Sequence, residues 1–381
     1  MSYDLPRDYF VCPPLSPEEY AYIEALAKRT ALDIVEKAQL LGGPIHWKFH
    51  SSERDMRIFR GQDAIDGGSL FVGAMEVAGT IEEIIELFRT DTPKHAARFR
   101  RRFGKGVSEA ITLYSLRDTP QERVAVKWQG FKSPLSLVRP RDNCVLECMH
   151  GFSMPDGRRG WVRGWKSVKI ACCPDLEDSL GFVRMLNHGS GLVFMESSTK
   201  SGAVDVLNVG HADMRVGKSE WILDKLQTRQ FLTHAAYLRR CRSILHLNKY
   251  LCEDRLALTP FAVVLDPIHA AKECFNCSHP LHRWSKKTAC LKCGHIMCRR
   301  CNLEWQVDDR AVLVCTACVC KVTPASPKAF TSVYHTTSPS SASSGAGWTN
   351  DLPQEWTVGS SVETTGAWIV DHPSIPSSSP R

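Results

Sequence analysis

Eight cysteines arranged as four closely spaced pairs are the residues of this sequence with the clearest chemistry. In every pair two residues separate the cysteines, and the pairs are Cys274 with Cys277, Cys290 with Cys293, Cys298 with Cys301, and Cys315 with Cys318. A turn of this length directs two sulfur atoms at one ion, and four thiolates complete the tetrahedral shell of a structural zinc ion. The eight ligands therefore predict two bound Zn²⁺ ions.

The distribution of cysteine and charge narrows the class of protein. Nine of the sixteen cysteines fall between Cys274 and Cys320, which is typical of a zinc module and not of a disulfide scaffold. The first residues carry acids and prolines where a signal peptide carries an apolar core. No apolar run reaches the roughly 18 residues of a membrane-spanning helix. We therefore expect a cytoplasmic protein whose thiols are reduced.

Net charge and motifs argue against two other classes. The formal charge of +7 falls to about +3 once two tetrathiolate zinc centres are counted, so we expect no nucleic-acid partner. The segment "RVGKS" (215–219) lacks the glycine-rich lead-in of a phosphate loop, and "HGSG" (188–191) lacks the spacing of a nucleophile elbow. Isolated histidines such as His211 and His234 are more typical of a core. We therefore expect no catalytic residues.

The elements that precede the cysteines predict an α+β domain. A capping box at Ser16 opens a helix over 16–41, strands follow at 45–50, 54–60 and 69–77, and short helices begin at Thr80 and Thr92. A long run of strands covers 108–213, and Ser219 begins a long helix that reaches about Leu247. A curved antiparallel sheet wrapped on a long helix encloses space in which an apolar ligand can sit.

Three residue patterns give expectations about burial. The first helix presents an apolar stripe that includes Tyr20, Ile23, Ala27, Ile34, Ala38 and Leu41. In "IHWKFH" the alternation of Ile45, Trp47 and Phe49 with polar residues predicts a half-buried strand. The basic run is expected to form a solvated helix face, and it consists of Arg98, Arg100, Arg101, Arg102 and Lys105.

The order of these elements resembles the START-like group of helix-grip domains, which is related to lipid-transfer proteins. The stretches "VKWQGFKSPLSLVRPRDNCVLE", "GRRGWVRGWKSVKIACCPDLEDS" and "GLVFMESS" carry the resemblance. It implies a START-like domain over 16–255 whose cavity takes an apolar lipid. In this group the domain is followed by a FYVE-type zinc finger.

The four cysteine pairs resemble such a FYVE-type finger, here over 260–322. In that family pairs one and three share one zinc ion and pairs two and four share the other, so the resemblance implies an interleaved, cross-brace arrangement. It also places Lys286 and Lys287 at the lipid headgroup, and Leu281 and Trp284 in a loop that enters the bilayer. The two histidines and the arginine of the family's headgroup motif are absent. The resemblance implies an anionic or phosphoinositide lipid partner, and peripheral association with endosomal or other internal membranes.

A competing interpretation starts from Cys293, where "CGHIMCRRC" resembles the centre of a RING finger. That ligand set uses His295 and leaves Cys290 out, and it implies a ubiquitin ligase that binds a ubiquitin-conjugating enzyme. Thr316 stands where a RING usually has proline. The FYVE-type set uses all four pairs and is preferred. A zinc-dependent adaptor for protein interactions remains a third alternative.

Residues 323–381 differ in composition from the rest of the chain. Ser, Thr, Pro and Gly dominate in segments such as "TTSPSSASSGAG", which predicts a disordered tail. Trp348, Trp356 and Trp368 stand out in it. They are interpreted as incidental aromatics or, alternatively, as a docking segment for a protein partner.

Overall fold

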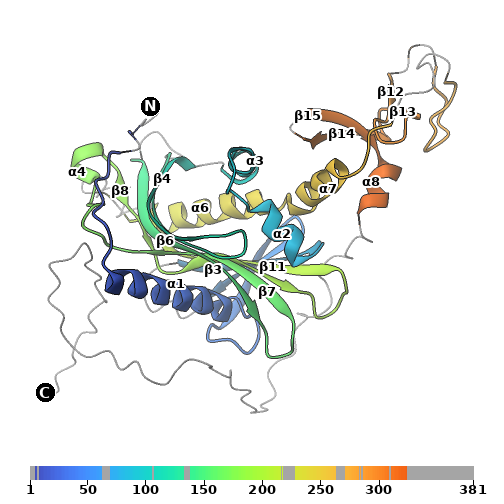
Figure 1. Cartoon of the computed structure of the whole chain (residues 1–381). Helices are drawn as coiled ribbons and strands as arrows, with labels where there is room; N and C mark the ends of the chain where they lie inside the picture. The colour runs from blue at the N-terminus through green and yellow to red at the C-terminus, as the bar shows by residue number, and fades with distance from the viewer. Residues whose placement is uncertain are drawn as a thin grey trace, which may run out of the picture.

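The computed structural model describes residues 5–6, 8–61, 69–104, 107–132, 138–215, 217, 228–262, 271–282, 284, 286–308 and 310–323. The predicted tail lies outside this set except for Thr323, and so does the predicted helix start at Ser219. Helices and one large sheet together make up an α+β fold, as predicted (Figure 1).

One sheet, antiparallel except for the parallel pairing of its short strand β8 with β6, forms the body of the molecule. Its strands follow the order β1-β2-β3-β11-β10-β7-β6-β5-β4, and the short β8 (Val183–Arg184) and β9 (Leu186–Asn187) pair with β6 and β11. The long strands are β1 (Trp47–Glu53), β2 (Met56–Gly61), β3 (Ser69–Ala78), β4 (Val107–Asp118), β5 (Arg123–Phe131), β6 (Arg141–Ser153), β7 (Arg159–Ser167), β10 (Ser190–Glu196) and β11 (Ala203–Asp213). The one-turn helix α4 (Glu177–Leu180) precedes β8.

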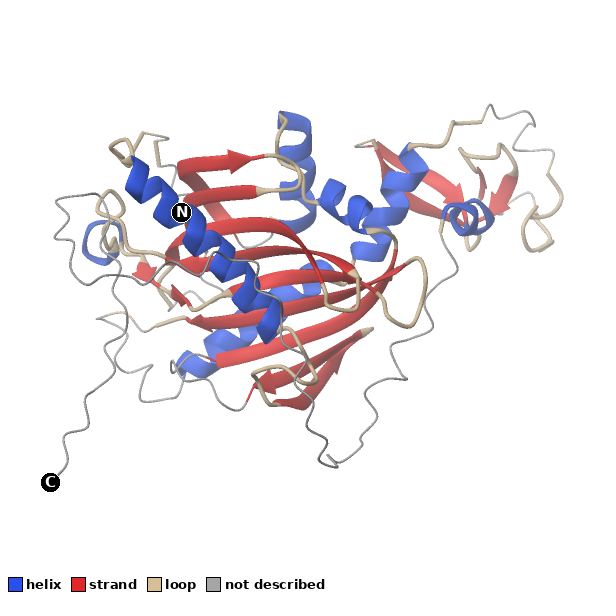
Figure 2. Ribbon diagram, turned by 60° about the horizontal axis from the view of Figure 1, so that its bottom comes forward, coloured by secondary structure: helices blue, strands red, loops and turns tan. Residues whose placement is uncertain are grey.

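Helix α1 (Pro17–Lys37) covers one face of this sheet, and Figure 2 shows a long helix crossing the strands. The capping box predicted at Ser16 is present, because Ser16 and Glu19 exchange side-chain to backbone hydrogen bonds. Ile34 packs against Gly164 and Gly191, where any side chain would collide with it. The helix is shorter than predicted because it ends at Lys37.

The predicted stripe of α1 is therefore correct except at its two ends, Tyr20 and Leu41. Ile23, Ala27 and Ile34 are buried, whereas Tyr20 is 38% exposed and Leu41, beyond the end of the helix, is 69% exposed. The alternation predicted for β1 also fails at Phe49, which is 57% exposed. A bulge between Phe49 and Ser51 shifts the strand register there, which disturbs the strict alternation of the two faces.

The other face of the sheet is covered by α2 (Ile81–Leu87), α6 (Thr228–Ile244) and α7 (Leu247–Ala257), with α3 (Pro93–Phe103) beside them. The capping box at Thr80 and the side-chain cap at Thr92 begin α2 and α3, as predicted. The long helix that was predicted to reach about Leu247 ends at Ile244, and α7, which was not predicted, begins at Leu247.

Helix α7 joins the sheet domain to the cysteine-rich region. On one side Arg255 pairs with Glu83 of α2, and Arg102 of α3 makes a bidentate ion pair with Asp254 at 2.7 and 2.9 Å. Arg102 is only 4% exposed, so the prediction of a solvated face is wrong for this residue. Its guanidinium also lies 3.4 Å from Glu253, and the two acidic residues of α7 explain why it is buried.

The cysteine-rich region packs on the other side of α7. It contains the hairpins β12 (Lys287–Ala289) with β13 (Ile296–Cys298) and β14 (Asn302–Val307) with β15 (Arg310–Cys315), followed by α8 (Thr316–Val322). Cys252 and Leu256 of α7 belong to its hydrophobic core, and the backbone N–H of Gln306 donates to Glu253. In Figure 1 this region lies at the far end of α7, away from the sheet.

A disulfide joins Cys12 to Cys172, although the sequence predicted that all thiols would be reduced. The bond ties the segment before α1 to the loop after β7, and Tyr114 of β4 also holds this segment by donating to the carbonyl of Pro13. Local spacing cannot predict this pair, because 160 positions separate the two residues.

We expect Cys12→Ser to lower the free energy of unfolding by about 2–5 kcal/mol, because the disulfide restricts a long loop in the unfolded chain. Urea denaturation followed by tryptophan fluorescence measures the change. Dithiothreitol should destabilise the wild-type chain and leave Cys12→Ser unaffected. Titration of two reactive thiols at these positions in the native wild-type protein would contradict the assignment.

Candidate metal centre

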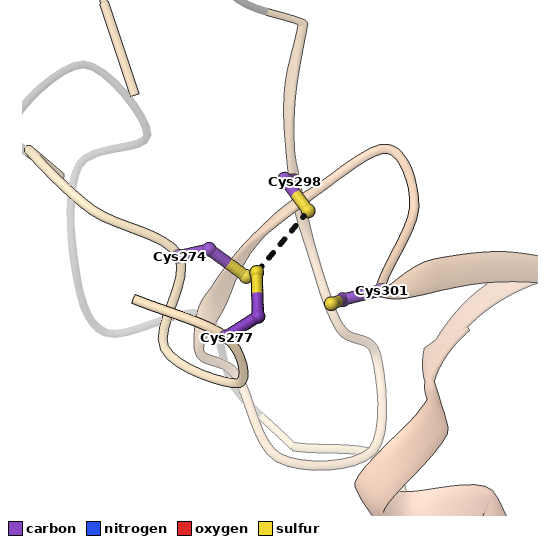
Figure 3. Close-up of side chains that lie close together, drawn as sticks. All are labelled: Cys274, Cys277, Cys298 and Cys301. Carbon is purple, nitrogen blue, oxygen red and sulfur yellow. Dashed lines mark hydrogen bonds between the residues drawn. The ribbon is translucent and has the colours of Figure 1, made fainter. Parts of the chain in front are cut away.

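The first group of four cysteines comes from pairs one and three. The sulfur atoms of Cys274, Cys277, Cys298 and Cys301 all lie within 4.8 Å of one another (Figure 3). The Cys277 and Cys298 sulfurs are 3.8 Å apart. Four sulfurs held tetrahedrally at 2.3 Å from one zinc ion would be separated by about 3.8 Å. The spacing of these thiols therefore fits a zinc ion.

The second group comes from pairs two and four, and it has the same dimensions. Its members are Cys290, Cys293, Cys315 and Cys318, again within 4.8 Å of one another. The sulfurs of Cys293 and Cys315 are 3.9 Å apart. The two groups alternate along the chain, so the structure brings together the eight predicted cysteines in the interleaved arrangement that the FYVE resemblance implied.

The first two pairs form matching turns. The carbonyl of Cys274 accepts from the N–H of Ser278, and the carbonyl of Cys290 accepts from that of Gly294, both at 2.8 Å. Ser278 and Gly294 both have left-handed backbones, with φ of 53° and 77°. In each turn the N–H of the first cysteine donates to a histidine carbonyl five residues later, at 2.9 Å. The repetition gives Cys274 and Cys290 equivalent positions.

Backbone N–H groups stabilise the thiolate form of these two cysteines. The sulfur of Cys290 accepts from the N–H of Lys292 at 3.4 Å and of Cys315 at 3.2 Å. Burial alone would raise the pKa of both thiols, but the N–H donors outweigh it. They lower the pKa of Cys274 to about 6 and shift the pKa of Cys290 in the same direction. Such thiols are suited to bind a cation as thiolates.

The ligand set of the RING interpretation is not the one that the described residues assemble. The ring of His295 stacks on Phe275, with centroids 3.7 Å apart, and belongs to neither sulfur group. Cys290, which that interpretation left out, is completely buried among the other sulfurs. The structure thus favours four cysteines at each site.

A hollow of about 500 Å³ adjoins the first sulfur group. It is lined by Cys277, His279, Leu281, Lys286, Cys298, Arg299 and Arg300. Lys286, Arg299 and Arg300 are exposed, so the hollow presents three cations to solvent. Lys287, the second predicted headgroup lysine, is half-buried and donates to the carbonyl of Ala271 at 2.7 Å. The structure therefore divides the predicted pair, and only Lys286 lines the hollow.

The two residues predicted to enter a bilayer also differ from each other. Trp284 is 93% exposed. Leu281 is 6% exposed and packs in the core of the cysteine-rich region, so its prediction as a membrane-inserting residue is wrong. Phe275, between the cysteines of the first pair, is 63% exposed, and it was not among the predicted site residues. An aromatic residue inside a tight metal-binding turn was the available signal.

A buried cluster of charges between the sheet and its helices was also missed. Glu147 of β6 accepts from Arg163 of β7 at 2.7 and 3.1 Å and pairs with Lys127 of β5. Glu147 and Arg163 are 1% and 5% exposed. None of these three residues was among the predicted site residues, because a charged residue in a strand is ordinarily expected to face solvent on an open side of the sheet. Both faces are in fact covered.

Comparisons with known proteins find solved structures of low similarity. No protein-family model and no curated protein matches the chain. Human StAR-related lipid transfer protein 5 is 17% identical, with a TM-score of 0.40 over 59% of this chain and 98% of that one. Human STARD10 is 15% identical, with a TM-score of 0.37 over 63% and 84%.

A STAR-related lipid transfer protein fragment from Xanthomonas axonopodis is 14% identical, with a TM-score of 0.31 over 52% and 98% of the two chains. With TM-scores below 0.5, these likenesses carry no argument about ligand or activity. The fold described above rests on the chain's own strands and helices. No described helix is both long and apolar enough to cross a membrane.

Proposed function

We propose that this protein is a non-enzymatic lipid-binding protein with two structural zinc ions. In this proposal the interior between the sheet and α6 takes a lipid, and the FYVE-type region holds the protein reversibly at an anionic or phosphoinositide-containing internal membrane. The START-like resemblance of the sequence supports the first part. The observation that carries the second part is the hollow beside the first sulfur group, with Lys286, Arg299 and Arg300 around it.

The residues around the hollow suit contact with a membrane surface. Each lysine or arginine near an anionic leaflet contributes about 1 kcal/mol, and an exposed tryptophan sits favourably among lipid headgroups. Three cations and Trp284 therefore support weak, reversible attachment. The eight cysteines position these groups, because the hollow is lined by ligands of the first site together with the residues that follow them.

We expect Lys286→Glu to reduce binding to vesicles of phosphatidylcholine and phosphatidylserine at least tenfold, because it replaces an attractive charge by a repulsive one. Flotation of the full chain with its zinc measures the bound fraction. Trp284→Ala should also weaken binding to the vesicles. This effect should persist at high salt, where the attraction between the cations and the anionic lipids is screened. Lys48→Glu is the matched control, because Lys48 is exposed on the edge strand β1.

Two results would limit or remove this part of the proposal. If vesicles with phosphatidylinositol 3-phosphate bind no better than phosphatidylserine vesicles of equal charge, recognition of a specific headgroup is excluded. If the wild-type protein floats with no anionic vesicle at all, membrane attachment through this region is abandoned.

A further inference from the structure

Among the described residues, the charged cluster around Glu147 between the sheet and α6 holds more positive than negative charge. Glu147 is the shared partner of Lys127 and Arg163, and both of its oxygens are occupied by them. Arg240 of α6 adds a third cation to the same interior: its guanidinium lies 4.2 Å from the centre of the Trp165 ring, and that of Arg163 lies 5.1 Å from it. Within the described part of the chain, one carboxylate of this cluster therefore faces three cations.

Arg240 is the member of this cluster without a counter-charge. It is half-buried, and among the described residues its guanidinium makes no hydrogen bond or ion pair, only the contact with Trp165. Burial, and then the charge of Arg163, lower the pKa of Arg240 to about 10, which still leaves it charged at neutral pH. A cation in such surroundings costs free energy unless an anion accompanies it.

A buried amide oxygen lies in the same row of the sheet. Asn208 of β11 and Arg163 of β7 are both in register with Leu192, so they lie two strands apart, about 10 Å. Asn208 is fully buried, and its amide nitrogen donates to Cys241, the neighbour of Arg240. Its side-chain oxygen has no hydrogen-bond donor among the described residues. A buried acceptor of this kind is completed by a donor from a water or from a bound molecule.

We propose that the lipid bound in this interior carries an anionic head group, a carboxylate or a phosphate, and that Arg240 and Arg163 hold it. This inference rests on the proposed lipid-binding function and narrows it to a chemical class. A carboxylate or phosphate can accept bidentate hydrogen bonds from a guanidinium and neutralise the excess charge. A hydroxyl of the same ligand can donate to Asn208. Neutral lipids such as diacylglycerol would leave the excess charge uncompensated.

The test compares lipids that share their hydrocarbon chains and differ in whether the head group is anionic or neutral. The full, zinc-loaded chain is stripped of lipid and incubated with phosphatidylcholine vesicles that contain equal amounts of phosphatidic acid and diacylglycerol, or of a fatty acid and the alcohol of the same chain length. The protein is then separated from the vesicles by size exclusion, and mass spectrometry measures the lipid that it retains. We expect the anionic member of each pair to be retained at least tenfold over the neutral one. The two pairs distinguish phosphate from carboxylate.

Variants of α6 assign the preference to this cluster. Arg240→Gln should lower the ratio of retained anionic to neutral lipid at least tenfold, and Arg240→Lys should lower it less. Arg239→Gln is the matched control: Arg239 is the exposed neighbour of Arg240, so this variant should keep the wild-type ratio. The same measurements in a Lys286→Glu background remove the contribution of surface attachment. Without lipid, Arg240→Gln should melt no lower than wild type, because the change removes an uncompensated charge. If Arg240→Gln does not fold, the ratio of anionic to neutral lipid that the wild-type protein retains tests the proposal.

The possible failures are distinguishable. If wild type retains no lipid of any kind, the proposed lipid-binding function fails and this inference fails with it. If wild type retains neutral and anionic lipids equally, or if Arg240→Gln keeps the full preference, the lipid-binding function stands and only the anionic specificity is overturned.

Discussion

Replacing Cys290 with serine is expected to unfold the cysteine-rich region and to release zinc from both sites. Cys290 belongs to the second sulfur group, and two backbone N–H groups converge on its sulfur. The ligands of the two sites alternate along the chain, so the loss of one site frees the segments that hold the other. Zinc contributes about 10–16 kcal/mol to the folding of small zinc domains near pH 7, which exceeds the stability that so short a segment gains from its own core.

Zinc content and resistance to proteolysis measure this effect. The wild-type chain should hold two zinc ions, and Cys290→Ser should hold fewer than one and be cleaved between α7 and the tail. A chelator should produce the same cleavage pattern in the wild-type protein. Cys320→Ser is the matched control, because Cys320 is exposed and lies outside both sulfur groups. Retention of two ions by Cys290→Ser would contradict the four-sulfur assignment.

His295→Ala also distinguishes the four-cysteine ligand set from the RING-type set, and here the four-cysteine set predicts no loss of zinc. Under the four-sulfur arrangement this variant keeps both zinc ions, because the imidazole only stacks on Phe275, and the hydrogen bond to Cys290 uses the backbone carbonyl of residue 295. Loss of one ion in His295→Ala, together with a silent Cys290→Ser, would restore the RING-type set.

The features that the sequence predicted correctly depend on short stretches of chain. The capping boxes at Ser16 and Thr80 each need only four consecutive residues, and both are present. The spacing within each cysteine pair is equally local. Which two cysteine pairs share a zinc ion does not follow from local spacing. That prediction came from the resemblance to a family with the same interleaved order.

The features that the sequence missed depend on what covers a surface. Arg102 is buried because α7 brings Asp254 and Glu253 to it from about 150 positions away. Leu281 is buried because its segment folds onto the core of the cysteine-rich region. The charges at Lys127 and Glu147 occupy strand positions that would face water if the sheet had an open side. A polar residue at an alternating strand position has two interpretations until the covering helices are known.

Replacing Glu147 with glutamine is expected to lower the free energy of unfolding by about 3–5 kcal/mol, because it leaves the buried cations Lys127 and Arg163 without their common anion. The geometry supports a large effect, since Glu147 is 1% exposed and both of its oxygens accept from these two residues. Urea denaturation at pH 7 measures the change. Glu196→Gln is the control, because Glu196 pairs with Arg159 at the exposed end of β10 and should contribute at most about 1 kcal/mol.

The pH dependence of this difference provides an independent check. Burial alone would raise the pKa of Glu147, but the charges of Lys127 and Arg163 outweigh it and hold the pKa well below its usual range. A carboxyl group whose pKa is lower in the folded state stabilises the protein above its unfolded pKa of about 4.3, and this contribution is lost as the pH falls toward the folded value. The gap between wild type and Glu147→Gln should therefore stay constant from pH 7 to about 5 and narrow below pH 4.

A second substitution tests whether uncompensated positive charge causes the loss of stability in Glu147→Gln. Adding Lys127→Met to Glu147→Gln removes one of the cations that lost its partner, so the double variant should recover part of the lost stability. If Glu147→Gln costs less than about 1 kcal/mol, or if the second change gives no recovery, water must reach the cluster. The positive excess around Arg240 would then be solvated, and the physical reason for an anionic ligand in this interior would disappear.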